Sequence, residues 1–154
     1  MKTAHAVNTA AGRCRRTAEV HAGERGAIEA ASGAEEELPD IERAAEAAAR
    51  HPDKPVVMVD NTFLGPSFQH PLMLGAHLCL YSATKYLSGY SDMLGGVAIT
   101  NSAAMVQKLR GVRSMFGNIM QPDECWMLDS RRPTVAPRMN RQSKNAQRVA
   151  EALK

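Results

Sequence analysis

Two hydroxyl side chains and a lysine stand close together near the middle of the chain, in the run SATKY. An apolar run at 78–81 precedes them, and a Gly-rich segment at 88–96 follows. The hydroxyls of Ser82 and Thr84 can donate to phosphate oxygens, and Lys85 offers a positive charge or a nucleophilic amine. The pattern is typical of a site for a phosphate-bearing cofactor, although a lysine that follows a strand is more often a solvated surface residue.

A carboxylate occupies the equivalent place after an earlier apolar run. Asp60 follows residues 56–59, and both this run and the run at 78–81 have the length and composition of buried strands. The connection between them contains a predicted helix at about 68–74 and is long enough for a parallel crossover. Because neighbouring parallel strands open their carboxyl ends onto one crevice, we expect Asp60 and Lys85 to face the same pocket.

A lysine, a carboxylate and hydroxyls that converge on one pocket suit pyridoxal 5'-phosphate. The lysine forms a Schiff base with the aldehyde, and the carboxylate keeps the pyridine nitrogen protonated. The segments VMVDNT at 57–62 and YSATKYLSG at 81–89, with Asp92 following, resemble the pyridoxal-phosphate-dependent cysteine/methionine metabolism (trans-sulfuration) family. That family includes cystathionine γ-synthase, cystathionine γ-lyase and methionine γ-lyase. Residues 138–150 resemble its interdomain helix, and the resemblance runs from about 40 to 154.

The resemblance implies a fold, a reaction and a role for each site residue. The fold would be α/β, a fragment of the large domain of a fold-type I (aspartate-aminotransferase-like) enzyme with a mostly parallel sheet and flanking helices. Lys85 would form the internal aldimine and shuttle the substrate's α-proton. Asp60 would pair with the pyridine nitrogen, while Ser82 and Thr84 would hold the phosphate. The reaction would be γ-elimination or γ-replacement on methionine, cystathionine or O-acylhomoserine.

The resemblance also implies that this is a partial chain. Family members bring a Gly-Met phosphate loop and a ring-stacking tyrosine upstream of this region, and an arginine for the substrate carboxylate downstream. We find none of these in the sequence. Two alternatives follow from the resemblance. One is a carbon-sulfur lyase or transferase, a homo-oligomer (dimer or tetramer) when complete, and the other is a catalytically inactive fragment that only pairs with full-length family members.

Charge and composition narrow the classes of function. The net charge of +3 over 154 residues favours neither a nucleic acid nor a membrane surface as partner, and no apolar run reaches the roughly eighteen residues of a membrane span. The cysteines Cys14, Cys79 and Cys125 and the five histidines show no metal-ligand spacing, so we expect no metal site. Free thiols indicate a reducing compartment, by default the cytoplasm. A basic-tailed nucleic-acid-binding protein is a third alternative, which the small net charge disfavours.

The remaining pattern divides the chain into three parts. Residues 1–38 predict a poorly structured leader and linker, 39–132 part of the cofactor-binding large domain, and 133–154 the start of a helix leading to a C-terminal domain. Residues 1–18 are basic without an acidic residue, which is typical of a transit peptide or a disordered tail. Residues 23–37 predict a linker or a weak helix. The other predicted elements are helices at 41–50, 103–115, from 122 and from about 134 to 154, and a strand at 97–100.

Some side chains in these elements carry expectations of their own. Asp40 is expected to cap the first helix. Met105, Leu109 and Val112 lie along one side of the helix at 103–115, which predicts that they belong to the core. Pro137 falls inside the last predicted helix, where it would remove a hydrogen bond or force a later start.

A local concentration of arginines surrounds the start of that last helix. It consists of Arg131, Arg132, Arg138 and Arg141. Such a group can meet phosphates, but a solvated helix face is the interpretation that the pattern favours.

Overall fold

A small sheet of four strands organises the computed structural model, which describes residues 27–29 and 40–154. The strands are β1 (Ala27–Glu29), β2 (Met58–Asp60), β3 (Leu78–Ser82) and β4 (Gly96–Ile99), in the spatial order β1-β2-β3-β4. The first three strands run parallel, and β4 pairs antiparallel with β3. The prediction of a mostly parallel sheet, with the runs before Asp60 and Ser82 as neighbours, is confirmed.

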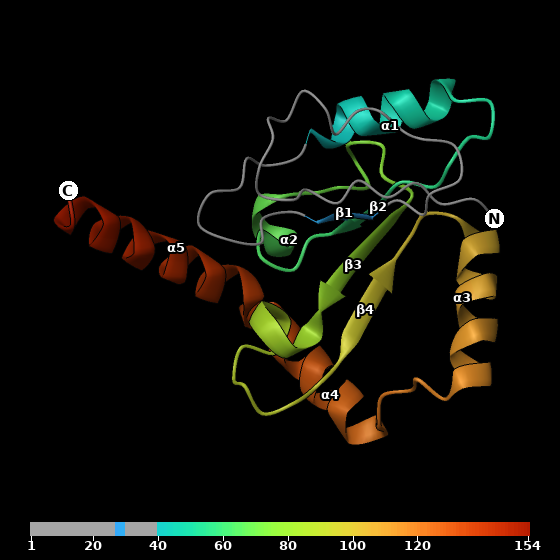
Figure 1. The fold of residues 1–154 in the computed structure, drawn as a ribbon. Coiled ribbons are helices and arrows are strands. Elements are labelled where there is room, and N and C mark those ends of the chain that lie inside the picture. Colours follow the sequence, from blue (N-terminus) through green and yellow to red (C-terminus); the bar gives the residue numbers. More distant parts are fainter. Residues whose placement is uncertain (1–26, 30–39) are drawn as a thin grey trace.

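Helical elements flank this sheet (Figure 1). They are α1 (Ile41–Arg50), α2 (Gly65–Phe68), the π-helical turn η1 (Ala83–Leu87), α3 (Ala103–Phe116), α4 (Pro122–Arg131), the 3-10 turn η2 (Arg132–Thr134) and α5 (Val135–Ala152). Both α4 and α5 lie against η1, and α5 also lies against α2. The turn that carries the lysine is therefore packed on the C-terminal helices.

The core lies between α1 and β2. The side chains of Ile41, Ala44 and Ala48 recur at helical spacing and form the buried face of α1. They meet Val57 and Val59 of the β2 segment, and Val59 is fully buried. As expected, the Asp40 side chain caps α1, because it accepts a hydrogen bond from the backbone N–H of Arg43 at 2.9 Å.

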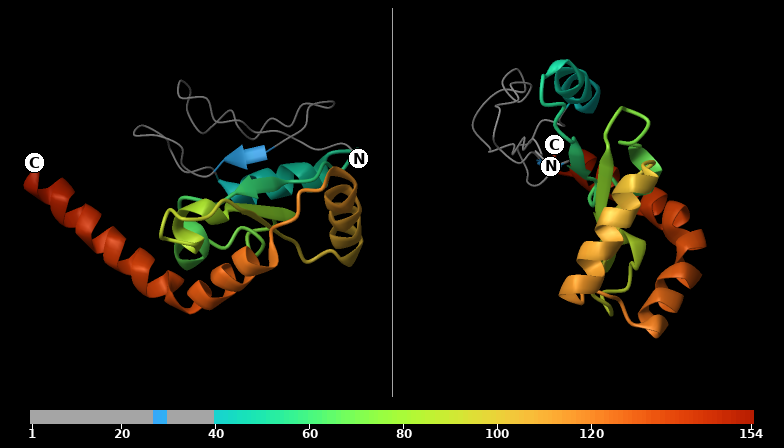
Figure 2. Two further views of the ribbon diagram at one scale, coloured as in Figure 1. Left: turned by 90° about the horizontal axis from the view of Figure 1, so that it is seen from below. Right: turned by 90° about the vertical axis from the view of Figure 1, so that its right-hand side faces the viewer.

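The last helix begins where its proline can be accommodated. Pro137 is the third residue of α5, and the N–H groups in the first turn of a helix have no intrahelical acceptor. Its missing N–H therefore costs α5 no hydrogen bond, and the expected disruption does not occur. A bend separates α4 from α5 instead, at η2, which contains Pro133 (Figure 2).

Two other predictions about elements are wrong. Met105 and Leu109 are only partly buried and Val112 is 52% exposed, so the predicted core stripe of α3 is not core among the described residues. Figure 1 shows the reason, because α3 stands at one side of the sheet and no further layer formed by 27–29 or 40–154 covers it. The helix predicted at 68–74 is also displaced, since α2 ends at Phe68 and turns follow it.

The prediction for residues 1–38 can be compared with the structure only at 27–29. Strand β1 falls inside the segment predicted as a linker or weak helix, and it pairs with β2 from Ala27 to Glu29. The rest of 1–38, including the transit-peptide and disordered-tail alternatives, lies outside the described residues. Within 27–29 and 40–154, none of the helices has the length and apolar character that a membrane span requires.

Candidate functional site

The carboxylate of Asp60 is held at the end of β2 by a neighbouring threonine. Its Oδ1 accepts hydrogen bonds from the backbone N–H of Thr62 at 3.0 Å and from the Thr62 hydroxyl at 2.6 Å. The same hydroxyl oxygen accepts a hydrogen bond from the backbone N–H of Ser82 at 2.7 Å. Thr62 therefore bridges the ends of β2 and β3 and orients Asp60 beside the residue that leads into the lysine turn.

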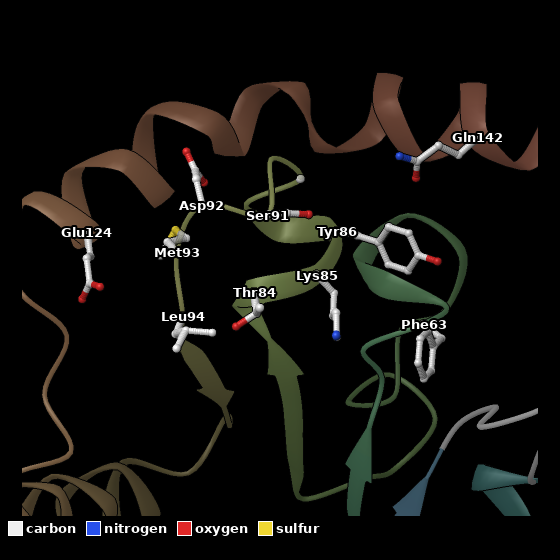
Figure 3. Close-up of a pocket in the computed structure, with 11 residues that line it drawn as sticks. Phe63, Thr84, Lys85, Tyr86, Ser91, Asp92, Met93, Leu94, Glu124 and Gln142 are labelled. Carbon is white, nitrogen blue, oxygen red and sulfur yellow. The ribbon is translucent and has the colours of Figure 1, made fainter.

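Lys85 lies in η1, the π-helical turn that begins directly after β3. Its backbone angles, φ −89° and ψ −121°, are not helical, so the turn opens at the lysine itself. The N–H groups of Ser88 and Gly89 close the turn by donating to the carbonyls of Ala83 and Lys85 at 2.9 and 2.8 Å. The exposed Lys85 side chain points into the space between Thr84 and Phe63 (Figure 3).

A cavity of about 790 Å³ surrounds the lysine. Its wall comes from the loop after β2, the lysine turn, the loop that follows this turn, and helices α4 and α5 (Figure 3). The lining residues are Phe63, Thr84, Lys85, Tyr86, Gly89, Ser91, Asp92, Met93, Leu94, Glu124 and Gln142. Two of the predicted site residues, Thr84 and Lys85, line this cavity. Asp60 and Ser82 do not line it and lie partly buried at the adjacent strand ends.

The donors and acceptors at these strand ends fit pyridoxal phosphate. Thr84 Oγ1 accepts a hydrogen bond from the N–H of Gly95 at 3.1 Å, which leaves its proton available for a phosphate oxygen. Among the described residues, neither the Ser82 hydroxyl nor Asp60 Oδ2 has a hydrogen-bond partner. An amine, a carboxylate oxygen and two hydroxyls are the groups that an aldehyde, a ring nitrogen and a phosphate require.

A buried amide that sequence reasoning missed supports the loop after β2. Asn61 is fully buried, and its Nδ2 donates to the carbonyls of Gly65 and Gln69, each at 3.0 Å, and to the Tyr81 hydroxyl at 3.2 Å. Burial raises the pKa of Tyr81 to about 12. Asn61 therefore fixes the loop that carries Phe63. The pattern of the DNT segment indicates Asp60 as a site residue, and nothing in it marks Asn61 as structural.

Two arginines of the group around the start of α5 contact the lysine turn and the loop that follows it. Arg131 forms a bidentate ion pair with Asp92, with nitrogen-oxygen distances of 2.6 and 2.7 Å, and this pairing lowers the pKa of the Asp92 carboxyl. Arg138 donates to the carbonyls of Tyr86 and Leu87 at 2.8 and 3.1 Å. The prediction of a solvated face is therefore wrong for these two arginines.

The prediction of a solvated face is right for Arg132 and Arg141, which are exposed. The contacts of Arg131 and Arg138 span 39 and 52 residues of sequence, so no local pattern could indicate them. In the part of the chain that the structure describes, no group of three or more His, Cys, Asp or Glu residues could hold a metal ion.

Comparison with known proteins places this site in context. A sequence model described as Cys/Met metabolism PLP-dependent enzyme matches residues 19–154. Over 114 residues the chain is 39% identical to "Cystathionine gamma-lyase" of Bos taurus and 39% identical to "Cystathionine beta-lyase" of Lactococcus lactis subsp. cremoris. Each match covers 74% of this chain but only 28% and 30% of the two relatives, so the chain spans less than a third of their length.

Solved structures show the same partial correspondence. The fold matches metB from Corynebacterium glutamicum with a TM-score of 0.77 and 35% identity, covering 82% of this chain and 32% of that one. It matches cystathionine gamma-lyase from Lactobacillus plantarum, complexed with L-serine, with a TM-score of 0.78 and 33% identity, covering 82% and 33%.

Proposed function

The chain belongs to the family of Cys/Met metabolism PLP-dependent enzymes, and from this membership we propose that it carries the lysine-bearing part of a site for γ-elimination or γ-replacement on a sulfur amino acid. The family depends on pyridoxal phosphate, and the expected fold, part of the α/β large domain of a fold-type I enzyme, is confirmed by the likeness to the solved structures. The reaction and the roles of individual residues are the proposal.

One observation carries it. Lys85 and Thr84 line a single cavity just beyond the carboxyl end of β3. Asp60 ends the adjacent parallel strand, and Thr62 orients its carboxylate. Ligands of parallel α/β sheets bind at this edge. The arrangement supports a cofactor that Asp60, Ser82, Thr84 and Lys85 would hold at the ends of β2 and β3.

Each residue has a task that its position supports. Ser82 and Thr84 would donate hydrogen bonds to the phosphate, and Asp60 Oδ2 would accept one from the protonated ring nitrogen. Pyridoxal phosphate, when bound, supplies an electron sink for negative charge at the substrate's α-carbon. Lys85 Nζ takes the proton from that carbon and returns it during the reaction. The closed turn that holds the lysine keeps this base near the reacting carbon, which is proximity catalysis.

The apolar part of the wall supports the substrate class. Phe63, Met93 and Leu94 line the same cavity as Lys85, and Met93 is nearly fully buried. Apolar and sulfur-containing side chains are suitable neighbours for a thioether or an acyl group. Methionine, cystathionine and O-acylhomoserine are therefore the proposed substrates. The complete protein is proposed to be a homo-oligomer in the cytoplasm, where the free thiols Cys79 and Cys125 would stay reduced.

Turnover assays test this function. The chain is incubated with pyridoxal phosphate and each of the three substrates, and release of a 2-oxo acid or of a thiol is followed. The proposal expects release that depends on pyridoxal phosphate and is abolished in Lys85→Ala. Equal release by the wild-type chain and by Lys85→Ala would reject the role of the lysine, and no release at all would reject catalysis by this chain alone.

A second candidate function is favoured by the exposed apolar side of α3. Val112, Met115 and Phe116 are 52%, 78% and 72% exposed, and exposed apolar patches of this kind often mark protein-protein contacts. An inactive chain that pairs with a longer family member would cover them. Co-purification of the chain with such a relative, without turnover of its own and lost in Phe116→Glu, would favour this candidate. A chain that always elutes alone would exclude it.

A further inference from the structure

The loop that follows Lys85 is held from outside at two points. At the first, Arg138 on α5 donates from Nη1 and Nη2 to the carbonyls of Tyr86 and Leu87, at 2.8 and 3.1 Å. At the second, Arg131 at the end of α4 pairs with both carboxylate oxygens of Asp92. Both contacts use the planar fork of the guanidinium, which a lysine cannot reproduce. We call these two contacts the arginine clamp.

Tyr90 and Gly89 lie between the two contacts and complete the clamp. The guanidinium carbons of Arg131 and Arg138 lie 4.7 and 5.8 Å from the centre of the Tyr90 ring, within the range of cation-π attraction. Gly89 has φ +78°, and a Cβ built on it would overlap the Arg138 guanidinium. Glycine thus supplies both the left-handed backbone and the space in which the guanidinium reaches the loop.

The first contact acts on the turn that carries the lysine. The carbonyls of Tyr86 and Leu87 belong to the last two residues of η1, where a helical turn leaves its carbonyls without intrahelical partners. Arg138 supplies partners for both of them, one and two residues after Lys85. The backbone at Lys85 is itself non-helical, and the residue whose N–H donates to its carbonyl, Gly89, lies against the Arg138 guanidinium. We therefore expect a shift of this guanidinium to change the backbone position of Lys85.

The second contact acts on the opposite wall of the cavity. Asp92 lines the cavity that Lys85 enters, and its bidentate pair with Arg131 fixes the loop where it returns toward β4. The Arg131 side chain is only 18% exposed, whereas that of its neighbour Arg132 is 77% exposed and pairs with Asp129, at 3.2 Å. The largely buried Arg131 therefore has a structural role, whereas the exposed Arg132 is a solvated cation.

We propose that Arg138 and Arg131 are positioning residues that hold Lys85 in the cofactor cavity from helices α4 and α5. The inference rests on the function proposed for Lys85. It assigns Arg131 and Arg138 of the basic group to the lysine turn and the loop after it, and not to a phosphate. Neither arginine contacts the reacting atoms.

The test measures how readily Lys85 captures pyridoxal phosphate. The full chain and its Arg138→Ala, Arg138→Lys and Arg131→Ala variants are incubated with pyridoxal phosphate and reduced with borohydride, and the modified lysines are identified by peptide mass mapping. Arg132→Ala is the matched control, because it removes an adjacent exposed arginine. Amide hydrogen exchange of residues 83–89 and of strands β2 and β3 is followed in parallel, without cofactor.

Arg138→Ala is expected to lower labelling of Lys85 by about tenfold, the effect of losing one net hydrogen bond to a charged group. Exchange at 83–89 should quicken while β2 and β3 stay protected. Arg138→Lys should recover little of the Lys85 labelling, and added methylguanidinium should restore labelling in Arg138→Ala. Arg131→Ala is expected to fall between Arg138→Ala and the control. Arg132→Ala should behave as the wild-type chain.

Three results would overturn the clamp. The first is labelling of Lys85 in Arg138→Ala at the level of Arg132→Ala, and the second is unchanged exchange at 83–89. A wild-type chain that is not labelled at Lys85 would contradict the proposed function instead. In that case the hydrogen-exchange data alone would show whether Arg138 restrains residues 83–89. Loss of protection in β2 and β3 as well as in 83–89 would make Arg138 a residue of global stability, which also contradicts positioning.

Discussion

The hydroxyl oxygen of Thr62 lies 2.7 Å from the backbone nitrogen of Ser82, twenty residues further along the chain. The hydrogen bond joins the ends of β2 and β3 at the point where their ladder stops. Since the same hydroxyl donates to Asp60, one small side chain links the proposed ring-nitrogen partner to the start of the lysine turn. The site therefore depends on the pairing of the two strands.

Removing the Thr62 hydroxyl should destabilise the chain. In Thr62→Val the buried position keeps its shape, but the N–H of Ser82 loses its acceptor and Asp60 loses one of its donors. An unsatisfied group of this kind costs about 1–3 kcal/mol of unfolding free energy. Urea denaturation of Thr62→Val and Thr62→Ser measures the effect. The serine variant should stay close to wild type, and equal stability of the two variants would contradict the bridge.

Asp60→Asn should weaken cofactor binding while leaving the fold intact. An asparagine Oδ1 can still accept both hydrogen bonds from Thr62, so the stability of the chain should change little. The amide carries no negative charge for a protonated ring nitrogen. Loss of a charge-assisted hydrogen bond of about 1.5–3 kcal/mol raises the dissociation constant of pyridoxal phosphate by roughly 10- to 100-fold. Titration of the absorbance of the bound cofactor measures that constant, and an unchanged value would rule out the pairing.

Asn61 and Tyr81 should differ in their effect on stability although they contact each other. Asn61→Ala leaves the carbonyl of Gln69 without its donor and the carbonyl of Gly65 with only the long hydrogen bond from the N–H of Gln69, at a cost of about 1–3 kcal/mol. Tyr81→Phe removes the longest of the three contacts of Asn61 and a weak contact with the Cys79 thiol, and the expected cost is below about 1 kcal/mol. Thermal or urea unfolding compares the two variants. The reverse order would show that the tyrosine, not the amide, holds the loop.

The buried tyrosine also predicts a dependence of stability on alkaline pH. Burial raises the pKa of Tyr81 from 10.0 to about 12, so the folded chain keeps a proton that the unfolded chain has already lost. The contribution of Tyr81 to the free energy of unfolding should be constant below pH 10 and decline from there to about pH 12. Spectrophotometric titration should show a phenol that ionises near pH 12 and is absent from Tyr81→Phe. A titration that is the same in both chains would contradict the burial.

The parts of the site that follow local patterns were predictable from the sequence. The runs before Asp60 and Ser82 are apolar and end in polar residues, and a parallel pair is the simplest arrangement for strands joined by a long crossover. The neighbouring position of the two strand ends followed from that arrangement. Their placement in the structure agrees with it, because β2 and β3 are paired in parallel.

The parts that depend on contacts between distant segments were not predictable. Arg131 and Arg138 looked like solvated cations, since their partners Asp92 and Tyr86 become neighbours only when α4 and α5 fold against η1. The apolar stripe that contains Val112 was expected to be buried, because helical spacing indicates which residues share a face. It cannot report whether another layer covers that face, and here none does among the described residues.

The most direct test of the account is the site of covalent capture of pyridoxal phosphate. The wild-type chain, Lys85→Ala and the control Lys108→Ala, which removes an exposed lysine on α3, are incubated with pyridoxal phosphate, reduced with borohydride and mapped by mass spectrometry. The account predicts modification concentrated on the peptide that contains Lys85, unchanged in Lys108→Ala and lost in Lys85→Ala. Labelling spread over many lysines, and equal in all three chains, would contradict a formed cofactor site around Lys85.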